Sequence, residues 1–178
     1  MDARAERGIV IREVEPTAAA LERIGRLRIA VWDGEGVLAD DYRARGVWTD
    51  EFDVEGRHWL AEAADGTLVA CARLTVHPTA EASPDGYVWL RAGLPLEPPV
   101  ANIAKLVVHA DARGLGLASE LNRVRIAAAR ALGARTLTVT ASKANARLLA
   151  GLGFRDTGLV VTFPNRPGFP FHALEMRL

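Results

Sequence analysis

The stretch from Leu106 to Ala118 constrains this chain more than any other part of its sequence. Three aliphatic residues at 106–108 lead into a turn with glycines at 114 and 116, and the turn opens into a helical pattern. Glycines let the backbone approach a bulky anion, and the unpaired N–H groups at the start of a helix point at it. Arg113 adds a planar cation suited to phosphate. The stretch therefore predicts a strand, a diphosphate-binding turn and a helix.

Two common phosphate-binding motifs do not fit this turn. A dinucleotide fingerprint needs a third glycine, where this chain has Ser119. It also needs an acidic residue after the next strand, where Ser142 and Lys143 stand. A Walker A loop needs Gly-Lys-Ser/Thr, which the turn lacks. Neither a dinucleotide nor a P-loop nucleotide site is predicted.

The hydrophobic pattern around the turn predicts a mixed α/β fold. Strands are expected where apolar residues alternate or run together, at 9–14, 58–63, 68–76, 103–108, 136–140, 159–163 and 172–178. Helices are expected at helical spacing, over 18–32, 116–132 and 143–152. Three connections are expected: a loop with a short helix at 40–53, a long loop at 78–100 and a stiff proline-rich lid at 164–170. The 178 residues show no internal repeat, and we expect one domain over 1–178.

Charge and composition argue against several classes of function. Lys and Arg total 22, as do Asp and Glu, so no global basic field exists to attract nucleic acid or anionic lipid. No window approaches the roughly 20 apolar residues of a membrane span, and the N-terminus lacks the apolar core of a secretory signal. Cys71 is the single cysteine, which favours a reducing compartment. We expect a cytoplasmic protein with no nucleic-acid partner, no membrane partner and no metal.

The turn and its surroundings resemble a known family. Arg113-x-x-Gly116-x-Ala118 resembles the R/Q-x-x-G-x-G/A signature of the GNAT superfamily of N-acetyltransferases. The order of elements is similar too, and Leu152-Gly153-Phe154 resembles the family's Leu-Gly-Phe close. The resemblance implies coenzyme A as the carrier, with acetyl-CoA as acyl donor and no metal. It also implies a mixed, mostly antiparallel sheet of about seven strands flanked by helices, splayed by a bulge between strands four and five.

The resemblance also implies which residues hold the donor. The turn would bind the pyrophosphate, and the main chain of 106–108 would pair with the pantetheine arm. The expected donor-binding residues are Leu106, Val107, Val108, Arg113, Gly114, Leu115, Gly116, Leu117, Ala118 and Asn145.

The first half resembles one branch of the same fold, the acyl-homoserine-lactone synthases and related long-chain N-acyltransferases. The motifs that carry this resemblance are Leu27-Arg28-x-x-Val31-Trp32, Asp50-Glu51-Phe52-Asp53, His58-Trp59-Leu60-Ala61, Asp65-Gly66 and Arg73-Leu74. It implies an ion-paired cluster of Arg28, Asp50, Asp53 and Arg73 at the acceptor pocket. The alternative is that these are surface charges. Trp32 is a candidate to line an apolar acceptor pocket, with packing in the core as the alternative. That branch carries E-x-x-R on strand four, where this chain has Asn102 and Lys105.

Acyl transfer to an amine benefits from a proton acceptor, and the sequence offers no obvious one. Relatives place Glu or His on strand four and Tyr on the late helix. The corresponding positions here are Asn102 and Leu149, which cannot exchange a proton. Asn102 could orient a water, and Ser142 is the nearest polar substitute for the tyrosine. These two are the candidate catalytic residues.

The histidines are secondary candidates for proton transfer. His109 ends strand four beside the turn, and His172 is expected at the start of the last strand, next to the lid. His58 and His77 are expected simply to end hairpin strands.

Three functions remain open. The first is an N-acetyltransferase that moves an acetyl group from acetyl-CoA to a primary amine of a small molecule or peptide, by direct attack in a ternary complex. The second is a long-chain N-acyltransferase that uses acyl carrier protein or acyl-CoA, with Arg123, Arg125 and Arg147 as a basic rim for the acidic carrier. The third is a non-catalytic coenzyme A-binding module. A homodimer is an open alternative to a monomer.

Overall fold

The computed structural model describes residues 8–36 and 38–178 and contains one seven-stranded sheet. Its strands are β1 (Val10–Val14), β2 (Arg57–Glu62), β3 (Leu68–His77), β4 (Val100–Val108), β5 (Thr136–Ala141), β6 (Arg155–Phe163) and β7 (Arg166–Arg177). The helices are α2 (Ala18–Gly34), α3 (Asp40–Arg45), α4 (Phe52–Glu55), α5 (Gly86–Arg91), α6 (Leu117–Ala131), α7 (Lys143–Gly151) and the short 3₁₀ helix η1 (Ala110–Ala112).

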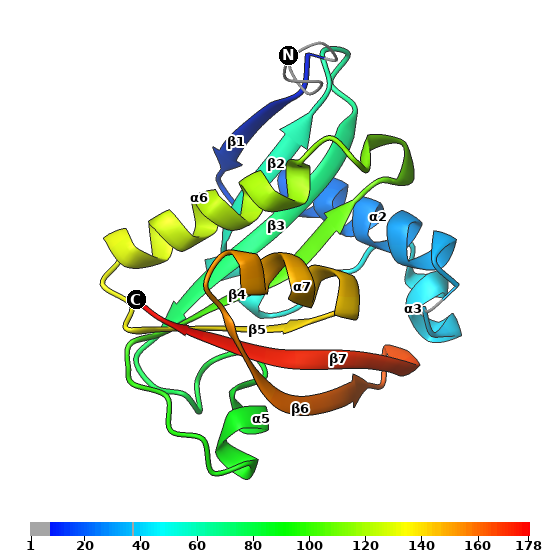
Figure 1. The fold of residues 1–178 in the computed structure, drawn as a ribbon. Helices are drawn as coiled ribbons and strands as arrows, with labels where there is room; N and C mark the ends of the chain where they lie inside the picture. The colour runs from blue at the N-terminus through cyan, green and yellow to red at the C-terminus, as the bar shows by residue number, and fades with distance from the viewer. Residues whose placement is uncertain (1–7, 37) are drawn as a thin grey trace. The chain divides into compact units, whose positions relative to one another are not determined.

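The strand order in the sheet is β1-β2-β3-β4-β5-β7-β6 (Figure 1). β1 pairs antiparallel with β2, and β5 pairs antiparallel with β7. β4 and β5 run parallel. The predicted mixed α/β fold with about seven strands is therefore confirmed.

The ladder between β4 and β5 is short. It joins Val100–Asn102 to Thr136–Thr138 and ends there, although β4 continues to Val108 and β5 to Ala141. Soon after the last paired residue, Lys105 has a φ of 55°, a left-handed conformation in the middle of a strand. Such a residue bends the strand and interrupts its pairing, as in a bulge. The predicted splay between these strands is confirmed.

Several predicted connections are wrong. Residues 78–100 contain α5, and β4 begins at Val100 instead of 103. Residues 40–53 hold α3 and the start of α4, so the region has two short helices.

The expected lid at 164–170 is not a loop. β7 begins at Arg166, so most of the segment is strand, and His172 lies inside β7 instead of at its start. β7 pairs with β5 only from His172 to Arg177. Pro167 and Pro170 therefore lie in a part of the strand where β5 requires no N–H donor, which is why prolines are tolerated there.

The described residues fall into two compact units. The first holds residues up to 73 together with 105–121 and 164–167. The second holds 74–104, 122–163 and 168–178. Each unit is described by itself below.

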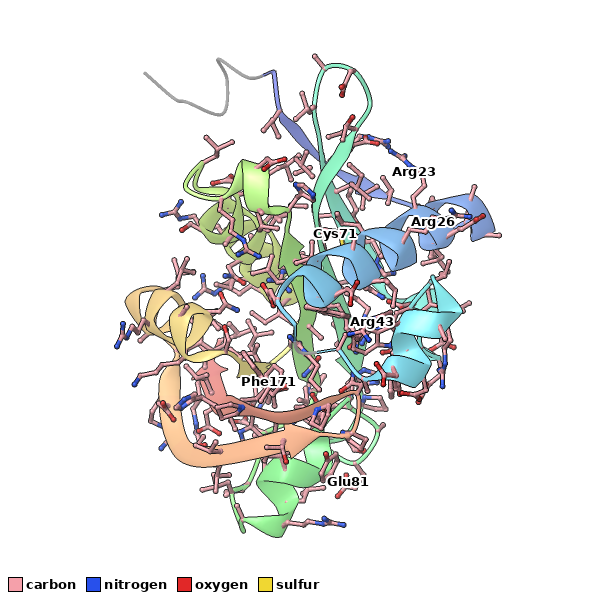
Figure 2. All side chains as sticks on the ribbon, turned by 90° about the vertical axis from the view of Figure 1, so that its right-hand side faces the viewer. Arg23, Arg26, Arg43, Cys71, Glu81 and Phe171 are labelled. Atoms are coloured by element: carbon pink, nitrogen blue, oxygen red, sulfur yellow. The ribbon has the colours of Figure 1, made fainter. Side chains whose placement is uncertain are left out.

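The first unit is built on the buried face of α2. Thr17 caps this helix by accepting a hydrogen bond from the Ala20 N–H at 3.2 Å. Ile24 and Leu27 pack with Cys71 of β3, which is buried. Figure 2 shows Cys71 beneath α2 and Arg23 and Arg26 on the outer side of that helix. Trp32 and Trp48 complete this core with ring centroids 4.0 Å apart.

The core of the second unit gathers around Trp89 of α5. Its partners are Ala80, Val88, Leu96, Val100 and Ala173, all buried. The long connection between β3 and β4 therefore contributes buried hydrophobic side chains to the core of the second unit.

We expect Gly25→Ala in α2 to destabilise the protein, although alanine is the better helix former. A methyl group at this position would run into the Val47 side chain and approach the Trp48 backbone nitrogen to 3.0 Å. Overpacking of this kind costs about 1–3 kcal/mol. Gly34→Ala in the same helix is the control, because nothing lies within 4 Å of its added methyl group. Urea unfolding should show a loss of stability for Gly25→Ala only; equal effects would contradict this packing.

Candidate functional site

Asp53 lies at the centre of a buried ion-pair cluster in the first unit. Its Oδ2 accepts a hydrogen bond from Arg28 Nη1 at 2.7 Å, and its Oδ1 accepts one from Arg28 Nη2 at 2.9 Å. Arg73 Nη1 donates to the same Oδ1 at 2.8 Å and also to Asp50 Oδ1. The Asp50 N–H donates to Asp53 Oδ2 at 2.8 Å. Both oxygens of Asp53 are thus engaged by charge-assisted bonds.

The local sequence explains why these charges are inside. Arg28 shares the buried face of α2 with Ile24 and Val31, at spacings of four and three residues. Arg73 lies within the buried stretch of β3. Asp53 lies in the first turn of α4. Arg28, Arg73 and Asp53 are almost completely buried, so the alternative of surface charges is wrong for them.

Electrostatics keep Asp53 ionised. Burial alone would raise the pKa of its carboxyl group, but the hydrogen bonds and charge of Arg28, with the charge of Arg73, lower that pKa well below its usual range. The Asp53 carboxylate is therefore charged throughout the neutral pH range.

Lys105 joins the same cluster, and the sequence analysis did not single it out. Its Nζ lies 3.3 Å from Asp50 Oδ2 and 4.4 Å from the centroid of the Trp48 ring. Burial lowers the pKa of its ammonium group, with the charge of Asp50 acting in the opposite direction. The sequence contains one signal that could have pointed to Lys105, because only Lys105 and Lys143 are lysines in a chain whose other basic residues are arginines.

His58 of β2 is fully buried against the cluster. Its Nε2 lies 2.9 Å from the Asp53 carbonyl oxygen, while its Nδ1 has no hydrogen-bond partner among the described residues. Burial lowers the pKa of this ring, and the neighbouring arginines act in the same direction. The histidine is thus neutral, with Nε2–H donating to the carbonyl. The sequence predicted only that His58 ends a hairpin strand, and it gave no indication of the contact with Asp53.

The glycine turn has the geometry that its sequence predicts. Gly114 and Gly116 have φ values of 78° and 73°, and a side chain built at either position meets nothing within 4 Å. Among the described residues, no protein group accepts from the backbone N–H groups of residues 116–119. α6 begins directly after, at Leu117. The turn therefore presents free donors beside open space.

Arg113 lies on the surface of this turn. Its Nη2 donates to Glu35 Oε1 at 2.8 Å, and its Nε donates to the Val108 carbonyl at 3.3 Å. The side chains of Arg113 and Glu35 are both substantially exposed. Such a pair is worth at most about 1 kcal/mol.

The two candidate catalytic residues lie in the second unit, where both have structural partners. Asn102 is buried, and its Nδ2 donates to Thr138 Oγ1 at 3.2 Å and to the Pro84 carbonyl at 3.3 Å. Its Oδ1 has no partner among the described residues. Ser142 is the N-cap of α7 and accepts from the Asn145 N–H at 3.4 Å. The side chain of Asn145 is half-buried in the first turn of that helix.

The expected basic rim is wrong for Arg125. This side chain is buried and donates to the Ala104 carbonyl at 3.2 Å and to Asn122 Oδ1 at 2.5 Å. It lies on the buried face of α6, four residues before the buried Ala129. Arg123 and Arg147 are exposed.

The other histidine candidates have partners of their own. His109 accepts from the Asp111 N–H at 3.4 Å as the N-cap of η1, and its side chain is 44% exposed. His172 Nδ1 lies 3.5 Å from Asp156 Oδ2 in the second unit. Within residues 8–36 and 38–178, no group of three metal-ligating side chains could hold a metal ion. Over the same residues, no helix has the length and hydropathy to cross a membrane.

Comparisons with known proteins agree on one fold. The model of the acetyltransferase (GNAT) family matches residues 22–154. A GCN5-related N-acetyltransferase from Kribbella flavida is 22% identical, with a TM-score of 0.59 over 97% of this chain and 99% of that one. FeeM, an N-acyl amino acid synthase from uncultured soil microbes, is 12% identical, with a TM-score of 0.70 over 95% and 90%. The AHL synthase LasI is 17% identical, with a TM-score of 0.62 over 95% and 88%. A search of curated protein sequences finds no match.

We expect Asp53→Asn to be strongly destabilising. It leaves two buried arginines with too little negative charge, and breaking a buried pair in this way costs about 3–5 kcal/mol. The control is Glu22→Gln, which removes an exposed pair with Arg26 and should cost under about 1 kcal/mol.

The pH dependence of unfolding gives a second readout for Asp53. Because its pKa is lower in the folded state, its contribution is complete above about pH 4 and is lost as the pH falls below that value. Urea unfolding of Asp53→Asn should therefore show a weaker loss of stability at acid pH than the wild type. Equal slopes would contradict the buried pair.

We expect His58 to make the protein less stable as the pH falls below about 6.5, the usual pKa of histidine. The unfolded chain takes up a proton there that the buried ring does not accept, so unfolding is favoured. His58→Gln should remove this part of the pH dependence of the free energy of unfolding. The exposed His109→Gln should leave it in place, and a wild-type slope in His58→Gln would show that another group is responsible.

Proposed function

The chain belongs to the acetyltransferase (GNAT) family, and from this premise we propose that it transfers an acyl group, most simply acetyl from acetyl-CoA, to a primary amine. It is an enzyme of that family. We propose its donor site, its acceptor and its mechanism. The amine of a small molecule or peptide would attack the thioester carbonyl directly, with both substrates bound. The main support is the turn at 113–118, which offers free N–H donors and open space.

The donor site that we propose is centred on this turn. Gly114, Leu115, Gly116, Leu117 and Ala118 would surround the pyrophosphate of coenzyme A, because N–H groups at a helix start and the helix dipole both favour an anion. Arg113 would exchange Glu35 for a phosphate.

The pantetheine arm would then follow β4. The ladder between β4 and β5 ends at Asn102, so the main chain of Leu106, Val107 and Val108 has no partner in β5. We propose that these residues hydrogen-bond to the amides of the arm. Apolar side chains at 106–108 are compatible with such main-chain binding.

The acceptor pocket that we propose is supported by the buried cluster. Asp53 accepts hydrogen bonds from both Arg28 and Arg73, so these three buried residues would hold the pocket's shape without touching the acceptor. Two members remain partly exposed, Asp50 at 21% and Lys105 at 20% of the side chain, and these could face a substrate. Trp32 is stacked under the guanidinium of Arg166, 4.5 Å from the ring centroid, and would form an apolar wall.

A second candidate function is long-chain N-acylation. The observation in its favour is the Arg28–Asp53–Arg73 cluster, which the resemblance to acyl-homoserine-lactone synthases implied. The fold likeness to FeeM, an N-acyl amino acid synthase, is compatible with either donor class. Burial of Arg125 weakens the proposed rim for an acidic carrier protein. Thiol release measured with acyl-CoA donors of graded length separates the two: a preference for acetyl supports the first function, and a preference for long chains the second.

We expect calorimetry to show that coenzyme A binds much more tightly than pantetheine, because pantetheine lacks the diphosphate. Arg113→Gln should weaken coenzyme A binding by roughly tenfold, about 1.4 kcal/mol, and leave pantetheine binding unchanged. Arg91→Gln is the matched control, since this exposed arginine of α5 is outside the turn. Equal affinity for the two ligands, or equal effects of the two substitutions, would refute the diphosphate site.

A further inference from the structure

We propose that Lys105 is a catalytic residue that accepts the proton of the attacking amine and passes it to the departing thiolate. The inference rests on the proposed acyl transfer and assigns a role that Asn102 cannot fill. It is carried by the position of Lys105 on β4, by its strained backbone and by the charges around its amine.

Position is the first argument. Within β4, from Val100 to Val108, Lys105 is the only residue whose side chain can exchange a proton. It directly precedes residues 106–108, the segment proposed to hold the pantetheine arm, and both belong to the first unit. A proton carrier on this strand is therefore close in the chain to the expected path of the thioester.

The backbone at Lys105 is the second argument. Its φ of 55° is in the left-handed region, which among the described non-glycine residues is shared only with Asp85. A long side chain is rarely found there, and such conformations cluster at sites where function requires them. Glycine would relieve the strain, and the chain keeps lysine instead.

The charges around the amine are the third argument. Nζ is held between Asp50 Oδ2 at 3.3 Å and the face of Trp48 at 4.4 Å. Asp50 is shared with Arg73, and Arg28 lies behind it on Asp53. Three cations thus face two carboxylates. Arginine does not give up its proton, so any proton that this excess charge expels comes from the lysine.

Other groups in the first unit are less suited to the role. Asp53 is fully buried and accepts hydrogen bonds at both oxygens. His58 is fully buried and donates to a carbonyl. His109 caps η1 beyond the end of β4. Lys105 combines a partly exposed amine with burial that lowers its pKa, which is the direction that suits a base.

Lys105 carries one proton from the amine to the thiol during acyl transfer. The lone pair of a neutral acceptor amine forms a C–N bond at the thioester carbonyl, and one N–H proton moves to the neutral Nζ of Lys105. The C–S bond breaks and its electron pair leaves with sulfur. The resulting thiolate takes the proton from the Lys105 ammonium. The products are the amide and the free thiol, and the lysine is neutral again.

The first measurement titrates Lys105 without any assay of activity. The protein has only two lysines, so NMR of a lysine-labelled sample shows two side-chain signals, assigned with Lys105→Arg and Lys143→Arg. We expect Lys105 to titrate below the usual pKa of a lysine, which is about 10.4. Titration of Lys105 at or above that value would overturn the proposal.

The second measurement is kinetic, with an amine acceptor. Lys105→Arg keeps the charge and the length but cannot accept a proton, so kcat should fall by about 10²–10⁴-fold with little change in the acceptor KM. The wild-type kcat/KM should rise with pH and level off at the pKa measured by NMR, and Lys105→Arg should lose that step. Lys143→Arg is the matched control and should keep the wild-type profile.

The variants also separate a role in catalysis from a role in folding or anchoring. Coenzyme A binding measured by calorimetry should be unchanged in Lys105→Arg, which shows that the fold is intact. If Lys105→Arg keeps the wild-type kcat while Lys105→Met has a raised KM, Lys105 supplies only a positive charge. That result would overturn the role of Lys105 in proton transfer and leave the proposed function in place. Coenzyme A binding without thiol release by the wild type, for every amine tried, would instead overturn the proposed function and this role with it.

Discussion

The carboxylate of Asp53 is the constraint on which the first unit depends. A charge buried this completely must be neutralised by partners in good geometry, and two arginines from α2 and β3 supply them. The Asp53 carboxylate therefore ties together a helix, a strand and the segment before α4. The same segment carries Trp48 and Asp50, so the ion pairs also fix the two groups that surround Lys105.

This arrangement divides the cluster into two kinds of members. Arg28, Arg73 and Asp53 are sealed from solvent and permanently charged, which suits them to hold geometry. Lys105 and Asp50 are at the accessible edge, and burial lowers the pKa of the lysine. A fixed positive environment beside a variable amine lowers the cost of the neutral form in the folded protein. The stability of the cluster and the proposed reactivity of Lys105 would then have one electrostatic origin.

The sequence predicted what depends on neighbours in the chain. The turn follows from glycine spacing and from Arg113, and the sheet follows from apolar runs. The cluster around Asp53 was expected only through a resemblance. What escaped prediction depends on distant partners: the burial of Arg125 on the inner face of α6, the strand conformation of Pro167, and the contact between His58 and Asp53. A left-handed φ at Lys105 has no local signal, because nothing in the residue type favours it.

The division of the chain into units bears on which residues the chemistry needs. The turn, the strand segment 105–108 and the cluster all belong to the first unit, whereas Asn102 and Ser142 belong to the second. In that unit Asn102 donates to Thr138, the residue opposite it where the β4–β5 ladder ends, and Ser142 caps α7. Each has a structural role that accounts for its position. The proton is therefore more economically handled by Lys105, which belongs to the same unit as the turn and the cluster.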